Sequence, residues 1–369
     1  MGKNIRVGIT HGDYNGIGYE VIIKALADEK IPELFTPVVF CAPRLFEKAR
    51  KDMQIEGLPA VETIKNAGDA RDGRINLLDL RISETPLTPG LPSKESGEAA
   101  VLALEKGVEA LRAGDIDVLV TAPICKTAVQ SDTFHFPGHT EYLEDRLAGD
   151  SDETEYKAQM ILFDDYLRVA LVTTHLPISE VAQAVTREKV ADSVIRLDRV
   201  LRSDFGIERP KIAVLSLNPH CGDNGLLGDD EQTKIIPAID ECAEKGVLAF
   251  GPYSADGFFA TKGYRNFDGV VAMYHDQGLA PFKALAEERG VNFTAGLPFV
   301  RTSPDHGTAY DKAWKGEADP TSMREAIYKA IDIYRNRERY RRASANPLRK
   351  AKVEKGGQDK TVDLSKDTL

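Results

Sequence analysis

RVALVTTHLP, residues 168–177, is a short apolar run followed at once by a histidine. The same arrangement recurs in KIAVLSLNPH, residues 211–220, and in DGVVAMYHD, residues 268–276. Short apolar runs bounded by polar residues are typical of buried strands in parallel sheets. The sequence therefore predicts three such strands, each with a histidine at or just after its end.

Further apolar runs extend this pattern over the rest of the chain. They are IRVGIT (5–10), PVVFC (37–41), INLLDL (75–80) and IDVLVTAP (116–123). Helix-like segments lie between them, such as SGEAAVLALEKGVEALRAGD (96–115), where we expect Ser96 to cap the start, Glu98 to lie in the first turn and Gly114 to end the helix. This strand–helix alternation predicts the α/β fold class with a parallel sheet.

Composition and charge narrow the class of protein. The chain has 369 residues, of which 42% are hydrophobic and 29% charged, the balance of a soluble globular protein. The net charge of -10 argues against general attraction to nucleic acid. The four cysteines are scattered, the N-terminus lacks the pattern of a signal peptide, and no window approaches the roughly 18 apolar residues of a membrane span. We expect a cytoplasmic protein that binds small molecules.

Three histidines are the main candidates for chemistry: His175, His220 and His275. Ligands of open parallel sheets bind outside the carboxyl ends of the strands, so these imidazoles can converge there. Three neutral imidazoles leave a divalent ion with open positions for substrate oxygens. A single histidine at a strand end is more often a hydrogen-bonded loop residue, but three in matching context favour a metal. Asp276 could orient an imidazole or be a solvated turn residue.

Several groups suit an anionic ligand. The glycine-rich turn HGDYNGIGYE (11–20) could receive an anion on its backbone amides or simply form a tight turn, and it matches neither the Rossmann nor the P-loop pattern. His139 and Thr140 stand at the start of a predicted helix, where a phosphate or carboxylate fits, although Thr140 could serve only as a cap. Lys283, Asn292 and Arg301 could bind phosphate; taken singly, each would be read as a surface residue.

Eight motifs in chain order resemble the family of 4-hydroxythreonine-4-phosphate dehydrogenases of pyridoxal phosphate biosynthesis, with its paralogues that act on phosphorylated sugar acids. The resemblance covers about residues 4–340. The motifs are GDYNGIG, SGEAAVLALEKGVEAL, VTAPICK, PGHTEYL, TTHLP, LNPHCGD, YHDQGLAPFK and NFTAGLPFVRTSPDHGTAYD.

The resemblance implies a two-lobed α/β/α fold similar to isocitrate and isopropylmalate dehydrogenases, with the active site in the cleft between lobes. Lobe 1, the cofactor side, would comprise residues 1–127 plus 296–340. Lobe 2, with the metal, the substrate and the dimer contacts, would comprise residues 128–295. Residues 341–369 form a polar tail that we expect to be partly disordered.

The resemblance also implies roles for individual residues. The metal ligands are carried over onto His175, His220 and His275, and the metal would be Zn, with Mg, Mn or Co as alternatives. The substrate-binding groups would be His139, Thr140, Lys283, Asn292 and Arg301. Lys283 could also assist proton transfer. The cofactor, NAD or NADP, would contact Asp305, His306 and Gly307, and a homodimer would share the active site. No residue stands out as the general base.

Departures from the family pattern are few. The family usually has GEPAGIGPE where this chain has GDYNGIGYE, Asn where Cys125 stands and Gly where Trp314 stands. We expect Cys125 to fill a small buried site, and Trp314 puts the adenosine-side contacts in question.

The expected reaction is oxidation of 4-phosphooxy-L-threonine at C3 followed by decarboxylation to 3-amino-2-oxopropyl phosphate. A paralogous dehydrogenase of 4-phosphothreonate or 4-phosphoerythronate is the main alternative. A metal-dependent hydrolase and a non-catalytic phosphometabolite-binding protein are more remote ones.

Overall fold

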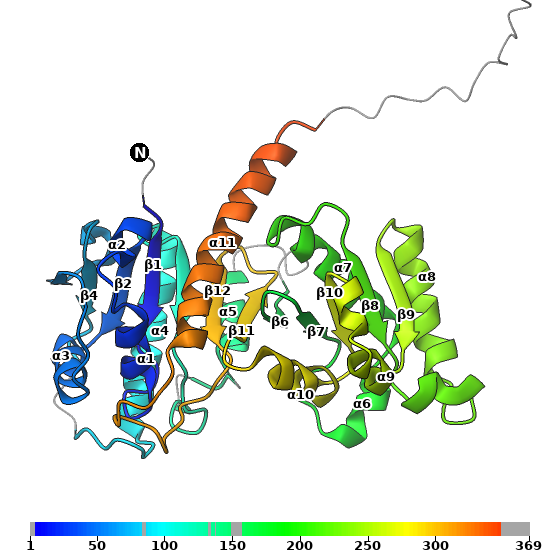
Figure 1. The fold of residues 1–369 in the computed structure, drawn as a ribbon, viewed down its shortest axis with the longest axis horizontal. Helices are drawn as coiled ribbons and strands as arrows, with labels where there is room; N and C mark the ends of the chain where they lie inside the picture. Colours follow the sequence, from blue (N-terminus) through cyan, green and yellow to red (C-terminus); the bar gives the residue numbers. More distant parts are fainter. Residues whose placement is uncertain (1–3, 83–85, 132–133, 137, 149–156, 348–369) are drawn as a thin grey trace, which may run out of the picture.

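The predicted strands belong to one twelve-stranded sheet in the computed structural model, which describes residues 4–82, 86–131, 134–136, 138–148 and 157–347 (Figure 1). The order of strands across the sheet is β3-β4-β2-β1-β5-β12-β11-β6-β7-β10-β8-β9. The strands are β1 (Arg6–Thr10), β2 (Thr36–Cys41), β3 (Val61–Ile64), β4 (Ile75–Asp79), β5 (Val118–Thr121), β6 (Gln159–Phe163), β7 (Arg168–Leu171), β8 (Lys211–Leu215), β9 (Leu248–Tyr253), β10 (Gly269–Ala272), β11 (Val291–Ala295) and β12 (Val300–Pro304).

The strands read from the apolar runs are all present, but they do not form a single parallel sheet. β1, β2, β4, β5 and β12 pair in parallel, and so do β7, β10, β8 and β9. Between the two sets, β12 is antiparallel to β11, β11 to β6, and β6 to β7. These three reversals make the two parallel sets run in opposite directions. The fold class is α/β, as expected, with an antiparallel centre that the sequence reading missed.

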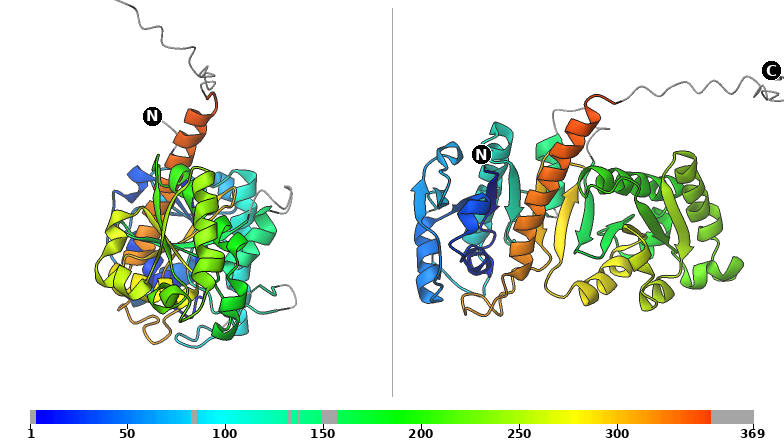
Figure 2. Two further views of the ribbon diagram at one scale, coloured as in Figure 1. Left: turned by 90° about the vertical axis from the view of Figure 1, so that its right-hand side faces the viewer. Right: turned by 45° about the horizontal axis from the view of Figure 1, so that its top comes forward.

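The helices cover the sheet on both faces (Figures 1 and 2). They are α1 (Gly18–Ala25), α2 (Ile31–Leu34), α3 (Pro43–Asp52), α4 (Lys94–Ala113), α5 (His139–Ala148), α6 (Ile178–Ala184), α7 (Arg187–Ser203), α8 (Ile236–Glu244), α9 (Ala255–Ala260), α10 (His275–Ala286) and α11 (Thr321–Ser344), with short 3-10 or π segments at Ala67–Asp69, Pro219–Asn224, Glu231–Ile235 and Gly263–Asn266. Helix α11 contacts strands β5, β11 and β12 and also α7, so it lies across the middle of the molecule.

The start of α4 differs by three residues from the prediction. The cap is Ser93, whose hydroxyl accepts from the amide of Ser96 while the hydroxyl of Ser96 accepts from the amide of Ser93. This reciprocal capping box satisfies two amides that a helix otherwise leaves unpaired, so it extends the helix backwards. Ser96 is therefore the third helical residue rather than the cap. The predicted end is confirmed, because Gly114 has a φ of 72° at the C-cap.

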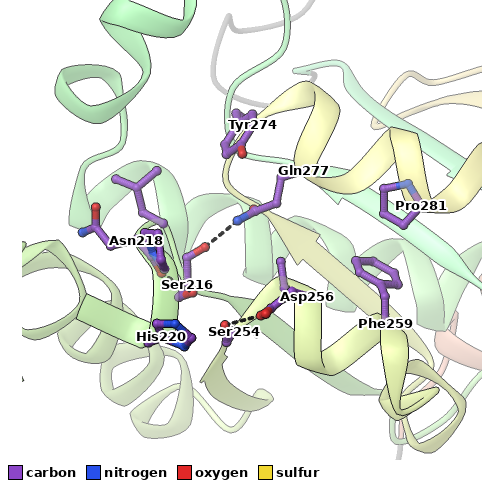
Figure 3. Close-up of a pocket in the computed structure, with 12 residues that line it drawn as sticks. Ser216, Asn218, His220, Ser254, Asp256, Phe259, Tyr274, Gln277 and Pro281 are labelled. Carbon is purple, nitrogen blue, oxygen red and sulfur yellow. Dashed lines mark hydrogen bonds between the residues drawn. The ribbon is translucent and has the colours of Figure 1, made fainter. Parts of the chain in front are cut away.

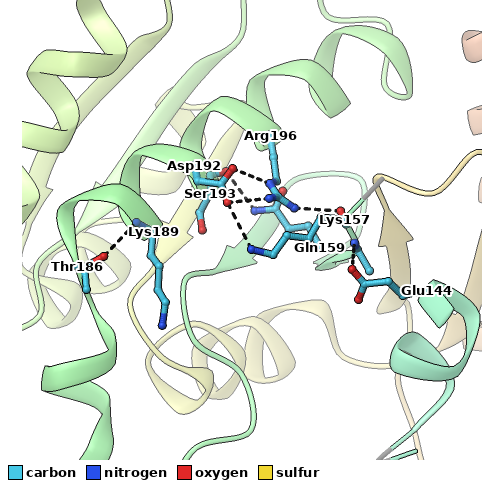
Figure 4. Close-up of polar contacts among 9 residues, drawn as sticks. Glu144, Lys157, Gln159, Thr186, Lys189, Asp192, Ser193 and Arg196 are labelled. Atoms are coloured by element: carbon cyan, nitrogen blue, oxygen red, sulfur yellow. Dashed lines mark hydrogen bonds and ion pairs between the residues drawn. The ribbon is translucent and has the colours of Figure 1, made fainter. Parts of the chain in front are cut away.

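Polar contacts fix the beginning of β6 against two helices (Figure 4). The amide of Ala158 donates to Glu144 of α5, and the side chain of Gln159 donates to the main-chain oxygen of Ser193 in α7. Arg196 of α7 donates to the main-chain oxygen of Lys157. These contacts place the central antiparallel strands, on which the candidate site is built.

The proposed lobe boundaries stay a prediction. Strands β1 to β5 and β12 stand together at one end of the sheet, and β6 to β11 make up the rest. Helix α11 continues to Ser344, so the predicted tail begins inside a helix, while residues 348–369 lie outside the described part of the chain. Among the described residues, no helix is both long and apolar enough to cross a membrane.

Candidate functional site

A cavity of about 220 Å³ lies over the central strands of the sheet. Arg301 and Ser303 reach it from β12, Asn292 from β11 and Met160 from β6, and the pairing of Asn292 with Ser303 puts them on one face of the sheet. Of the residues predicted from the sequence, those that line this cavity are His139, Thr140, His175, Asn292, Arg301, His306 and Gly307. The antiparallel centre thus gathers side chains from segments distant in the sequence.

Arg301 is the buried cation of the cavity. Its side chain is 2% exposed, and its guanidinium group donates to the hydroxyls of Thr121 and Thr294. Burial lowers the pKa of Arg301 to about 9, so the group stays charged at pH 7. A buried cation held by two hydroxyls keeps unused donor capacity, which suits an anionic ligand.

His139 stands at the start of α5 and faces the same cavity. Burial lowers the pKa of His139 well below its ordinary value, and the nearby charges of Arg301 and Lys126 lower it further. The imidazole is therefore neutral at pH 7 and presents one donor and one acceptor. Among the described residues that line the cavity, Glu141, two residues along α5, is the only carboxylate, beside the two cations Lys126 and Arg301. This charge balance favours an anionic ligand.

His175 and His275 lie side by side, with ring centroids 6.1 Å apart. Nδ1 of His175 is 3.6 Å from Oε1 of Glu141, and Nδ1 of His275 is 2.7 Å from Oδ1 of Asp276. A carboxylate on Nδ1 orients an imidazole and leaves Nε2 for a metal ion. These two histidines and their carboxylates fit a divalent ion in their donor chemistry.

His220 lies in a different cavity, of about 580 Å³, lined also by Tyr274 and Gln277 (Figure 3). The chain turns sharply here, since His220 and the next five residues all have positive φ. Within the described part of the chain, no three His, Cys, Asp or Glu residues are grouped closely enough to hold a metal ion. Thus the three imidazoles do not converge within one chain as expected from strand ends alone; only His175 and His275 are adjacent.

Lys283 does not line the cavity that holds the other substrate-binding candidates. Its ammonium group, on α10, is bound instead to the carboxylate of Asp305. Asp305 and His306 line a third cavity, of about 310 Å³, and His306 and Gly307 also line the Arg301 cavity. The three predicted cofactor residues therefore lie on the wall between two cavities. Burial raises the pKa of Asp305.

In the glycine-rich turn at residues 11–20, several backbone amides are hydrogen-bonded to main-chain oxygens of the protein itself. The amides of Asp13 and Ile17 donate to the main-chain oxygens of Pro123 and Thr308, and the amide of Gly16 donates to that of Asp13. Gly12 has a φ of 67°, and a Cβ there would meet the oxygen of Pro123 at 2.3 Å. The turn therefore serves close packing rather than anion binding.

The two departures near the site also have structural consequences. Cys125 is partly exposed, with its sulfur 3.2 Å from the hydroxyl of Thr127, so the expectation of a small buried site is wrong. Trp314 has a φ of 60°, in the left-handed region, and its indole N–H donates to the main-chain oxygen of Tyr14. The tryptophan thereby joins the loop after β12 to the glycine-rich turn.

Sequence reasoning passed over several residues that matter here. Lys126 and Glu141 line the Arg301 cavity, and both lie inside motifs quoted above, VTAPICK and PGHTEYL. Gln277 lies in YHDQGLAPFK, and its side chain hydrogen-bonds the main chain just after β8 and just after β10. Each of these residues stands next to a predicted site residue in the sequence, and this is the feature by which it could have been identified.

Comparison with known proteins gives consistent matches. Residues 33–330 match the family described as pyridoxal phosphate biosynthetic protein PdxA. The chain is 50% identical over 367 residues to 4-hydroxythreonine-4-phosphate dehydrogenase of Bacteroides thetaiotaomicron, covering 100% of this chain and 98% of the relative. It is 37% identical over 332 residues to D-threonate 4-phosphate dehydrogenase of Pectobacterium atrosepticum, covering 89% and 98%. A crystal structure of 4-hydroxythreonine-4-phosphate dehydrogenase from Klebsiella pneumoniae superposes with a TM-score of 0.77 at 34% identity, covering 90% of this chain and 98% of that one.

Proposed function

The chain belongs to the family of the pyridoxal phosphate biosynthetic protein PdxA, and we propose that it is a 4-hydroxythreonine-4-phosphate dehydrogenase. The substrate, 4-phosphooxy-L-threonine, would be oxidised at C3 and then decarboxylated to 3-amino-2-oxopropyl phosphate. Oxidation releases the hydroxyl proton and decarboxylation takes up one proton at carbon, so the balance is one NAD reduced and one carbon dioxide released. The full-length 50% match favours this substrate over D-threonate 4-phosphate, which appears in the names of relatives that are 40% and 37% identical to this chain.

The position of Arg301 is the main support for a phosphorylated substrate. Arg301, which is 2% exposed, lines the cavity of about 220 Å³ together with neutral His139 and the cation Lys126, so the cavity favours an anionic group. Asn292 and Thr140 add hydrogen-bonding groups to the same cavity. Together these residues would bind the terminal phosphate and hold the hydroxy-acid portion toward His175.

We assign the divalent metal to His175, His220 and His275. His175 and His275 support this assignment through their adjacency and their carboxylate partners Glu141 and Asp276. When bound, a divalent ion would polarise the C3 hydroxyl and stabilise charge that develops on oxygen, while NAD would accept the hydride. Zinc is the first choice for three imidazoles, with Mg, Mn or Co as alternatives.

We place the cofactor along Asp305, His306 and Gly307. The cavity of about 310 Å³ beside them is lined by five carboxylates and one lysine: Glu287, Glu288, Asp305, Asp311, Asp319 and Lys312. This charge balance would repel the additional phosphate of NADP and leaves acceptors for ribose hydroxyls. We therefore propose NAD as the preferred cofactor.

We also propose that the protein is a cytoplasmic homodimer with a shared active site. The distance of His220 from the other two histidines supports sharing, because a ligand from a partner subunit could complete each metal set. Exposed apolar side chains near His220, Leu226 at 78% and Leu227 at 45%, would be covered in such an assembly. All four cysteines are free, as in a reducing compartment.

The test measures NADH formation by purified protein with added Mg, Mn, Co or Zn. Substrates are 4-phosphooxy-L-threonine, 4-phosphothreonate and 4-phosphoerythronate, each beside its unphosphorylated form. We expect the highest kcat/KM with 4-phosphooxy-L-threonine and NAD. Faster turnover of a phosphorylated sugar acid would reassign the substrate, and no NADH from any of them would overturn the dehydrogenase assignment in favour of a hydrolase or a binding protein.

A further inference from the structure

The loop from β12 to α11, residues 305–320, is hydrogen-bonded at several points to the segment that leads into α1 and to α1 itself (Figure 1). The amide of Ile17 donates to the main-chain oxygen of Thr308 at 3.0 Å. Further along the loop, the indole of Trp314 donates to the main-chain oxygen of Tyr14 at 2.9 Å. These two bonds hold the loop as far as Trp314.

Lys24 and Glu20 of α1 hold the rest of the loop. The ammonium group of Lys24 donates to the main-chain oxygens of Gly316 and Ala318, both at 2.8 Å, and to Oε1 of Glu20 at 2.7 Å. The same oxygen of Glu20 accepts from the amide of Ala318 at 2.7 Å. The three donors of the ammonium group are therefore all used, and both main-chain polar groups of Ala318 are bound by this pair.

Burial makes the two side chains depend on each other. The Glu20 side chain is 1% exposed and that of Lys24 is 22% exposed. Oε2 of Glu20 has no hydrogen-bond partner among the described residues, so Lys24 and the amide of Ala318 supply the compensation of this buried carboxylate. A buried charge that loses its partner is costly, and the pair therefore favours one arrangement of the loop.

The residues held in this way belong to the wall of the proposed cofactor cavity. Ala318 and Asp319 line the cavity of about 310 Å³, and so does Ile17, the residue that precedes α1. The beginning of α1 thus forms one part of this wall directly. Through Lys24 and Glu20, the same helix also fixes the place of Ala318 in another part of it.

We propose that Lys24 and Glu20 are positioning residues that hold residues 316–318 against α1 and so keep the NAD cavity in its binding shape. This inference rests on the cofactor placement made under the proposed function. Neither residue is among the described residues that line the cavity, so the pair acts on NAD through the loop. Without the pair, the loop spends part of its time displaced, and the apparent affinity for NAD falls by that fraction.

Isothermal titration calorimetry of the full-length protein with NAD measures binding without turnover. Wild type is compared with Lys24→Met and with the control Lys48→Met, which breaks an exposed ion pair of the same spacing, Lys48 with Asp52 on α3. We expect Lys24→Met to raise the Kd for NAD about 10-fold, the change when the loop keeps its binding arrangement about a tenth of the time. The control should match wild type.

Steady-state kinetics separates positioning from general damage. Because bound NAD restores the arrangement of the loop, KM for NAD should rise about 10-fold in Lys24→Met, whereas kcat should stay within about twofold of wild type. KM for the phosphorylated substrate at saturating NAD should also stay within about twofold. A fall in kcat together with equal rises in both KM values would mean a structural defect and would overturn the positioning role.

If Lys24→Met does not fold, the decision passes to the double variant Glu20→Gln/Lys24→Met. This variant leaves no unpaired buried charge and keeps an acceptor for the amide of Ala318, but it still lacks the donors to the main-chain oxygens of Gly316 and Ala318. An unchanged Kd for NAD in the folded variant would overturn the positioning role while leaving the proposed function intact. Failure of the wild-type protein to bind NAD would overturn the cofactor placement and the inference together.

Discussion

The ammonium nitrogen of Lys283 lies 3.0 Å from Oδ1 of Asp305 and 3.1 Å from the main-chain oxygen of the same residue. Lys283, which the family resemblance predicts to bind substrate, lies outside the Arg301 cavity, and Asp305 is a proposed cofactor-binding residue. The contact joins α10 to the loop that follows β12. Substrate and cofactor binding should therefore be coupled through this pair.

Replacement of Lys283 by methionine tests the coupling. Loss of the ammonium should raise KM for the phosphorylated substrate by about 10-fold, the value of one charge-assisted hydrogen bond. It should also raise KM for NAD, because Asp305 loses the cation that keeps it in place. Steady-state kinetics with each substrate varied in turn gives both values. Lys315→Met, which removes an exposed lysine of the same loop, is the control, and an unchanged KM for NAD in Lys283→Met would contradict the coupling.

Arg301→Met should separate phosphate recognition from folding. Methionine fills much of the buried volume without a charge, so the protein should stay folded, with a cost of about 1 kcal/mol for each unpaired threonine hydroxyl. KM should rise about 10- to 100-fold for the phosphorylated substrate and change little for its unphosphorylated form. Thr294→Val removes one partner of the arginine but keeps the charge, and should have the smaller effect. An equal rise for both substrates would count against the phosphate role.

His220→Ala tests the residue whose position agrees least with a single-chain site. As a direct ligand, it should lower metal affinity by more than about 100-fold, beyond the loss seen for residues that only orient ligands. Metal content after dialysis, NADH formation and circular dichroism are measured together. Full turnover by a metal-free His220→Ala protein would remove this residue from the metal set. His135→Ala changes an exposed histidine elsewhere and serves as the control.

The sequence predicted the strands best where they are continuously apolar. β1, β2 and β8 are buried over almost all their length, and their runs were read correctly. β3, β6, β9, β11 and β12 were missed. Of these, β11 carries the polar Asn292 and Thr294 on the face that looks into the site. A strand built to line a polar cavity lacks the apolar run by which buried strands are recognised. The polar residues that β11 contributes to the cavity therefore prevented its recognition as a strand from the sequence.

Site residues were predictable one by one, but their grouping was not. Local pattern placed His139 at a helix start and His175 after a strand, as the structure has them. The reversed direction of the second parallel set decides which of them meet, and no local pattern encodes that reversal. Consequently Arg301 joins His139 in one cavity, whereas His220 faces another. Gln277 hydrogen-bonds main-chain groups just after β8 and just after β10, a connection that sequence periodicity cannot reveal.

Trp314 offers a direct measurement of cofactor binding, since it is the only tryptophan of the chain. It lies on the loop after β12, with its indole bonded to Tyr14, and so should respond when that loop closes on a nucleotide. We expect NAD and ADP-ribose to change its fluorescence at lower concentrations than NADP, because five carboxylates line the adjoining cavity. Asp319→Asn should narrow the difference between NAD and NADP. A stronger response to NADP in the wild type would refute the proposed preference.

His11 should make the fold less stable at low pH. His11 follows β1, is completely buried and stacks on Tyr19, with ring centroids 5.3 Å apart. Neither ring nitrogen has a hydrogen-bond partner among the described residues. Burial lowers the pKa of His11 from 6.5 to about 4, so the folded protein keeps the imidazole neutral at pH values where the unfolded chain is protonated.

Because the unfolded state binds the extra proton, stability from this group is complete above pH 6.5 and is lost as the pH falls from 6.5 to about 4. The loss amounts to about 3 kcal/mol for a shift of this size. Urea unfolding of wild type and His11→Phe across this pH range measures the difference, and phenylalanine preserves the stacking without a titrating group. The variant should show a shallower decline in the free energy of unfolding. Parallel curves for the two proteins would mean that His11 is protonated in the folded state, which its burial makes costly.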